Sequence, residues 1–182
     1  MSAAAFLSRV EALLSDYAPA DPTEASFRKR MLDLVKAPRA VQRNHFDPGH
    51  FTASAFVLSP EGDRVLLIFH TKLSRWLQPG GHVEASDADP SDTARREVLE
   101  EVGIAGTSLS APSDAFFDID IHPIPPRPSE PAHEHFDLRF LFIARSHEFA
   151  ATTEVTDAKW VPLVELSRMT TDESVLRAVR KI

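Results

Sequence analysis

The stretch that decides the fold is residues 96–104, which read REVLEEVGI. At about 100° per residue, Glu97, Glu100 and Glu101 fall within roughly a third of the circumference of a helix. Like charges at this spacing repel one another and destabilise a helix. Two interpretations are therefore open at this level: a solvated acidic helix face, or a face whose carboxylates converge on a cation.

The helix that carries these glutamates has clear sequence boundaries. Asp89 is expected as the N-cap, Pro90 lies in the first turn, and Gly103 suits the left-handed position just past the last turn. The side chains expected on its buried face are Ala94, Val98 and Leu99.

A glycine turn lies upstream of this helix. Residues 79–81 read Pro-Gly-Gly and follow a short extended segment at 76–78, in a chain that has only 6 glycines. Adjacent glycines allow the backbone to approach a ligand or a metal closely. Carboxylate oxygens beside such a turn form the donor set that Mg²⁺ or Mn²⁺ prefers.

Taken together, residues 81–104 resemble the signature of the Nudix hydrolase family, G-x5-E-x7-R-E-U-x-E-E-x-G-U, in which U is a bulky apolar residue. Residues 96–104 match every specified position. The first half departs from the pattern, because residue 87 is Asp in place of Glu and eight residues separate Asp87 from Arg96. A one-residue insertion before Asp89 accounts for the spacing.

The resemblance implies metal-assisted hydrolysis of a diphosphate linkage that joins a nucleoside or related group to another moiety. It implies Mg²⁺ or Mn²⁺ as cofactor, held by Glu97, Glu100 and Glu101 with the Gly81 carbonyl completing the shell. Glu97 is the candidate base, and Arg96 would orient the glutamates. Because the family varies in its base, a downstream acid, Glu134 or Asp137, is the alternative.

Two other functions compete with hydrolysis within this resemblance. A non-catalytic Nudix-fold sensor that only binds a ligand would be favoured if the glutamates were missing, and all three are present. A Nudix-fold isomerase of the isopentenyl diphosphate type would want a catalytic cysteine, and the chain contains no cysteine.

Polar residues alternate along two predicted strands. They are Asp118, Asp120 and His122 on one strand and His135, Asp137 and Arg139 on the other. Alternation of this kind is typical of a solvated sheet face. The alternative is the wall of a substrate pocket, in which Arg139 contacts phosphate, Asp137 lies nearby and His82 of the glycine turn adds a further contact.

The pair His133 and His135 offers a separate possibility. Two histidines that alternate along one strand could chelate zinc, but the sequence specifies no third ligand and no cysteine.

The remaining pattern predicts an α/β fold, a Nudix-like α/β/α sandwich with a mixed sheet. Helices are expected over 3–17 and from 22 to just before Pro38, and a helical tail over 163–169 and 173–182. Strands are expected over 51–58, 64–70, 115–122, 136–144 and 159–161. Residues 1–45 would form an N-terminal helical extension and 46–182 the Nudix domain. Packing, substrate binding and a homodimer interface are all open as roles for the extension.

The amino-acid composition limits the kinds of partner that the protein can bind. The 182 residues carry a formal charge of −7 and contain no apolar run near the roughly 20 residues of a membrane helix. We therefore expect a cytoplasmic protein with no membrane and no nucleic-acid polymer among its partners. Residues 84–101 hold seven acids against two arginines, which concentrates the charge in one stretch. A small phosphorylated, nucleotide-like substrate that arrives with its metal remains compatible with this charge.

Overall fold

A ten-residue strand, β1 (Gly49–Leu58), forms the centre of the computed structural model, and all ten of its residues are buried. The structure describes residues 2–71, 73–150, 152 and 155–182. Its other strands are β2 (Arg64–His70), β3 (Arg75–Leu77), β4 (Gly80–His82), β5 (Leu109–Ser110), β6 (Asp118–Ile124), β7 (His133–Ala144) and β8 (Ala158–Pro162). Its helices are α1 (Ala3–Asp16), α2 (Pro22–Leu34), α3 (Pro90–Val102) and α4 (Glu173–Val179), with short 3-10 helices η1 (Gly106–Ser108) and η2 (Leu163–Arg168).

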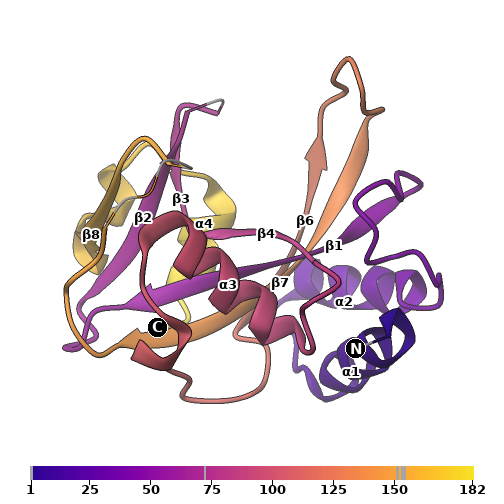
Figure 1. Ribbon diagram of the computed structural model, residues 1–182, viewed down its shortest axis with the longest axis horizontal. Coiled ribbons are helices and arrows are strands. Elements are labelled where there is room, and N and C mark those ends of the chain that lie inside the picture. The colour runs from indigo at the N-terminus through magenta and orange to yellow at the C-terminus, as the bar shows by residue number, and fades with distance from the viewer. Residues whose placement is uncertain (1, 72, 151, 153–154) are drawn as a thin grey trace.

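The described strands form one mixed sheet with the path β3-β2-β1-β7-β5, as the sequence predicts for the fold class. β1 and β7 run parallel, and every other pairing is antiparallel. β4, β6 and β8 lie off this path and pair with β1, β7 and β2, respectively. In Figure 1, the hairpin of β6 and β7 extends beyond the rest of the sheet.

Several strands differ from expectation. The strand expected over residues 115–122 is β6, which spans Asp118–Ile124, and β5 is not among the expected strands. β7 begins at His133 instead of residue 136, because it pairs with β6 as far as Ile124 and with β1 as far as Gly49. β4 is absent from the predicted elements, since two of its three residues are glycines with low strand propensity. It forms because it pairs with residues 52–54 of β1.

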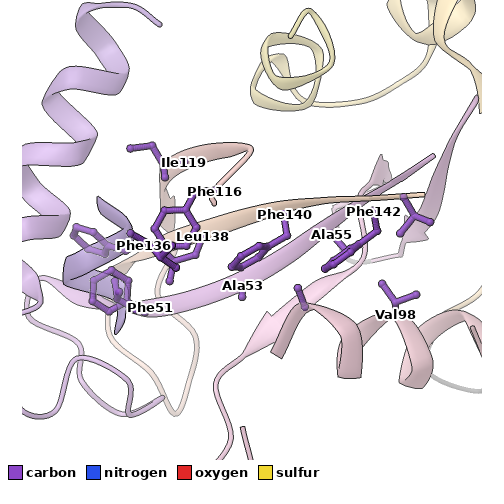
Figure 2. Close-up of a cluster of buried hydrophobic side chains, with 14 of the residues drawn as sticks. Phe51, Ala53, Ala55, Val98, Phe116, Ile119, Phe136, Leu138, Phe140 and Phe142 are labelled. Atoms are coloured by element: carbon purple, nitrogen blue, oxygen red, sulfur yellow. The ribbon is translucent and has the colours of Figure 1, made fainter. Parts of the chain in front are cut away.

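Helices α1, α2 and α3 cover one face of the sheet (Figure 1). The labelled side chains of β1 and β7 in Figure 2 lie in a row from Phe51 to Phe142, with Val98 of α3 below the row and Phe116 and Ile119 above it. The N-terminal helices share this core with the sheet, through residues such as Leu14 and Met31. The expected extension therefore has its apolar stripe buried within the same hydrophobic cluster.

One expectation about α3 is wrong. Leu99 was expected to be buried, and it is 48% exposed. The buried stripe of α3 instead runs through Ala94, Val98 and Val102, which follow one another at intervals of four residues. Leu99 lies about 100° around the helix from Val98, on the edge that faces away from the core.

The opposite face of the sheet is apolar at one end and polar along the rest. A second cluster packs η2 and α4 against Phe56, Val65 and Leu67. Beyond it, the His122 side chain is 40% exposed, but Asp118, Asp120, Asp137 and Arg139 are buried instead of solvated, which corrects that interpretation of the alternation for these four residues. They join side chains from α2 and the C-terminal helix in an ion network that consists of Glu24, Asp118, Asp120, Asp137, Arg139, Arg177 and Lys181.

Glu24 ties the N-terminal helices into this ion network. Its carboxylate accepts hydrogen bonds from Arg177 at 3.1 Å and from the Tyr17 hydroxyl at 2.8 Å, and Lys181 lies 2.5 Å away. The residue is fully buried. Buried charges of this kind depend on their partners, because removing one leaves the others unpaired in the interior.

No helix among the described residues combines the length and the apolar character that a membrane crossing requires.

Glu24→Gln is expected to lower the free energy of unfolding by about 3 kcal/mol, since Arg177 and Lys181 lose a buried counter-charge. Urea unfolding monitored by circular dichroism measures the change. The matched control is Glu173→Gln, which removes an exposed partner of Arg180 and should change stability by less than about 0.5 kcal/mol. Equal effects of the two substitutions would contradict a structural role for the network.

Candidate functional site

Helix α3 begins and ends where the sequence predicts. The Asp89 side chain accepts a hydrogen bond from the Ser91 backbone N–H at 2.9 Å, and Asp92 accepts one from the Asp89 N–H at 3.0 Å. Gly103 has φ +69, the left-handed conformation that closes the helix. These caps fix the rotation of α3, and therefore the direction in which its glutamates point.

The glycine turn lies directly against these glutamates. A Cβ placed on Gly81 would lie 2.3 Å from Oε1 of Glu97, so no larger residue fits without moving that carboxylate. The backbone N–H of Gly80 donates to Oε2 of Glu101 at 3.1 Å. A Cβ on Gly80 would meet Cβ of Ser54 at 2.4 Å. Close approach to both α3 and β1 explains the pair of glycines.

Arg96 links the whole segment, because all five of its N–H donors are directed at acceptors. Its Nε and Nη2 each donate to Asp87 at 3.1 Å, and Nη2 also donates to the His82 carbonyl at 2.7 Å. Its Nη1 donates to Glu97 at 2.9 Å and to Glu100 at 2.8 Å. One guanidinium thus offsets the repulsion between two glutamates and fastens them to the glycine turn.

The structure shows what Asp87 does at the position where the family pattern has Glu. It is 6% exposed and accepts hydrogen bonds from Thr93 Oγ1 at 2.8 Å and the Glu84 N–H at 2.9 Å, besides those from Arg96. Burial by itself would raise the pKa of Asp87, but the hydrogen bonds from Arg96 and Glu84 lower it below its usual value. Asp87 therefore anchors the arginine as an ionised carboxylate.

The glutamate carboxylates differ in exposure and are not gathered into one tight cluster. The side chain of Glu97 is 12% exposed and that of Glu100 is 38% exposed, with Arg96 between them. Within the described part of the chain, the group of three side chains whose ligand atoms all lie within 4.8 Å of one another is His50, His133 and His135. In this structure Glu97 and Glu100 are paired with Arg96.

Arg139 and Asp137 do not lie on an exposed pocket wall. Arg139 is 1% exposed, and its guanidinium contacts Asp118, Asp120, Asp137 and the Ser174 hydroxyl. Asp137 accepts hydrogen bonds from Thr52 at 3.1 Å and Ser54 at 2.7 Å. Both side chains are buried and engaged inside the ion network.

His82 belongs to a cluster of histidines that the sequence alone did not assemble. The cluster consists of His50, His82, His122, His133 and His135, and the centroids of neighbouring rings lie 4.9–5.5 Å apart. Strand register brings them together, since His50 of β1 pairs with His135 of β7 and His135 pairs with His122 of β6. Only the spacing of His133 and His135 was visible in the sequence as a signal.

Burial sets the protonation of His82 and His135. Removal from water lowers the pKa of His82 to about 4, and the charge of neighbouring His50 adds to the effect. Burial, followed by the charge of His122, lowers the pKa of His135 to about 2. Both imidazoles are therefore neutral at pH 7.

Fold and site together define a class: an α/β sandwich that places a carboxylate-bearing helix against a glycine turn, which pairs with the central strand of a mixed sheet. The family model described as the NUDIX domain matches residues 48–180. This chain therefore belongs to the Nudix family.

Known proteins of similar sequence or fold agree with this family assignment. The mutator protein MutT4 of Mycobacterium tuberculosis is 38% identical over 93 residues, which cover 50% of this chain and 34% of that protein. The match thus spans about a third of the relative's length. A crystal structure of a Nudix-family hydrolase from Clostridium perfringens is 25% identical, with a TM-score of 0.54 over 72% of this chain and 95% of its own. The dihydroneopterin triphosphate pyrophosphohydrolase of E. coli shares the fold, with a TM-score of 0.57 at 18% identity over 72% of this chain and 93% of its own.

The neutral histidines make stability depend on pH. The folded pKa of His82 lies below the unfolded value of about 6.5, so the unfolded state binds more protons as the pH falls through this range. His82→Gln is therefore expected to remove up to about 1.4 kcal/mol per pH unit from the slope of the free energy of unfolding between pH 6 and 5. Denaturant unfolding with a chelator present measures it.

The control is His147→Gln, because His147 is half exposed and pairs with Glu61. Its slope should equal that of the unsubstituted protein. A His82→Gln slope that also equals the unsubstituted value would show that His82 is not held neutral by the fold.

Proposed function

We propose that the chain is a metal-dependent hydrolase that cleaves a diphosphate linkage in a nucleoside diphosphate derivative or a similar small molecule. The observation that carries this proposal is the arrangement around Arg96. A single guanidinium positions Glu97 and Glu100, and the glycine turn packs against Glu97 and Glu101.

The residues present fit Mg²⁺ or Mn²⁺. The donors offered by this site are oxygens: the carboxylates of Glu97, Glu100 and Glu101 and the carbonyl of Gly81. Hard oxygen donors of this kind suit these ions, which leave positions open for water and phosphate. The missing side chain at Gly81 leaves room for the Glu97 carboxylate, which a Cβ would displace. When bound, the ion would neutralise phosphate charge and lower the pKa of a water molecule.

Arg96 and Glu97 have separate roles in the proposed reaction. Arg96 positions the glutamates and is itself held by Asp87, so it acts as a positioning residue. Glu97 is our candidate for the proton acceptor, because its carboxylate lies against the glycine turn and is held at 2.9 Å by Arg96. The alternative acids downstream are both engaged elsewhere: Glu134 pairs with Arg30, and Asp137 lies in the ion network.

The substrate proposal stays at the level of a chemical class. Solved structures of the same fold are named for different substrates: dihydroneopterin triphosphate for the E. coli protein, and Ap4A for a C. elegans hydrolase that has a TM-score of 0.52 at 18% identity. Small phosphorylated compounds of the nucleotide type therefore form the panel to be tested. A non-catalytic sensor is the weaker candidate, since the three glutamates and the arginine that fixes them are all present.

Glu101→Gln is expected to lower Mg²⁺-dependent turnover at least ~100-fold on any active member of a panel of nucleoside diphosphate derivatives, because one charged donor is lost. Release of phosphate-containing products is the measurement. The control is Glu11→Gln, an exposed acid on α1 that should retain full activity. Absence of turnover on the whole panel would overturn the enzyme proposal, and a fully active Glu101→Gln would overturn the site.

Gly81→Ala tests the close approach of turn and helix. The added methyl group meets the end of the flexible Glu97 side chain, so we expect the fold to survive while the carboxylate is displaced. Turnover should fall at least ~10-fold, as is usual when a catalytic group is misplaced by about an ångström. Gly106→Ala is the matched control, since its nearest neighbour lies at an ordinary 3.5 Å. Equal activities of the two variants would contradict the role of Gly81.

A further inference from the structure

We propose that His50, His133 and His135 form a second metal site, which binds Zn²⁺ and is chemically distinct from the glutamate site on α3. Their ligand nitrogens lie within 4.8 Å of one another. Tetrahedral zinc with Zn–N bonds of about 2.0–2.1 Å holds its nitrogens roughly 3.3 Å apart. Small rotations of the three imidazoles bring them to that separation.

The sheet itself presents these three side chains to one point. His50 is opposite His135 in the parallel pairing of β1 with β7, and His133 precedes His135 by two residues on the same strand. Residues that are opposite or alternate in this way point to the same face of a sheet. The ligands therefore come from two adjacent strands of the central sheet, which keep their backbones in place.

One buried nitrogen of this cluster lacks a hydrogen-bond partner among the described residues. His50 is 1% exposed, and its Nε2 makes no hydrogen bond within that part of the chain. An unpaired polar atom in the interior is costly, and buried polar groups are otherwise almost always satisfied. A metal ion at the centre of the three rings supplies the missing partner.

Backbone carbonyls select the tautomer that such a site requires. Nδ1 of His50 lies 3.1 Å from the carbonyl of His45, and Nδ1 of His133 lies 2.8 Å from the carbonyl of Pro131. A carbonyl oxygen only accepts, so each Nδ1 carries the proton and each Nε2 presents a lone pair. Metal-bound histidines are held by hydrogen bonds of this type from their other ring nitrogen.

The surroundings favour a cation. The adjoining ion network contains four carboxylates against three cationic side chains, which leaves a formal excess of one negative charge. One of these carboxylates, Asp120, lies 3.2 Å from His122, whose ring is 5.5 Å from His135. The ring of His82 lies 5.1 Å from those of His50 and His135. An all-imidazole donor set suits Zn²⁺ and not Mg²⁺.

The test uses the full chain, freed of metal by a chelator and kept in excess Mg²⁺ so that the glutamate site is saturated. Titration with Co²⁺ as a spectroscopic probe should give one equivalent of bound ion with visible d–d absorption. Competition against a chromophoric chelator gives the Zn²⁺ affinity. His133→Gln and His135→Gln should each weaken it at least ~100-fold, since one of three protein ligands is lost.

Two controls separate this site from other donors. His147→Gln removes a half-exposed histidine that pairs with Glu61, and Glu100→Gln alters the glutamate site. Both should leave Co²⁺ absorption and Zn²⁺ affinity unchanged. Circular dichroism of each metal-free variant establishes that it is folded, and the two ligand variants are independent should one of them unfold.

The proposal is overturned if the chain binds neither Zn²⁺ nor Co²⁺ in the presence of Mg²⁺. It is also overturned if affinity persists in the folded histidine variants or disappears in either control. Because the readout is binding without substrate, its outcome is independent of whether the proposed hydrolysis is found.

Discussion

The pairing of Arg96 with four acceptor groups is the interaction on which the candidate site depends. Three carboxylates on one helix face would repel one another and lower the stability of α3. The guanidinium offsets this repulsion at Glu97 and Glu100, and its other donors reach Asp87 and the His82 carbonyl. The guanidinium of Arg96 is planar and all its donors are used. It therefore holds the helix, the glycine turn and the loop that contains Asp87 in one relative position.

The same electrostatic requirement shapes the opposite side of the sheet. Arg139 lies in the interior and is stable there only because Asp118, Asp120 and Asp137 surround it. The C-terminal residues Arg177 and Lys181 extend the pairing to Glu24 of α2. Charge pairing thus joins helix α2 near the N-terminal end of the chain to the residues that follow β8.

Next to the cations of that network, the polar side chains of β6 and β7 are histidines. The neutral rings of His82 and His135 can be buried without counter-charges, as their lowered pKa values reflect. Two kinds of donor therefore lie on either side of the glycine turn. Carboxylate oxygens of α3 meet it at Gly80 and Gly81, and imidazole nitrogens gather around His82. Hard metal ions would therefore bind at the carboxylate oxygens, and borderline ions such as Zn²⁺ at the imidazole nitrogens.

Local signals were sufficient for the elements that are stabilised within themselves. The caps at Asp89 and Gly103 fixed α3, because capping depends on residues a few positions apart. β4 escaped prediction, since a Gly-Gly-His segment becomes a strand only through its partner β1. Leu99 was assigned to the wrong face because a short apolar set is compatible with more than one stripe.

The sequence by itself determined the family, the helix that carries the glutamates and the glycine turn beside it, since all of these lie within the 26 consecutive residues 79–104. Tertiary structure alone decided that Arg139 is buried, that Asp87 anchors Arg96, and that His50 joins His133 and His135. The physical reason is separation along the chain. His50 and His135 are brought together by β-sheet register, which depends on the pairing of whole strands and on no short motif.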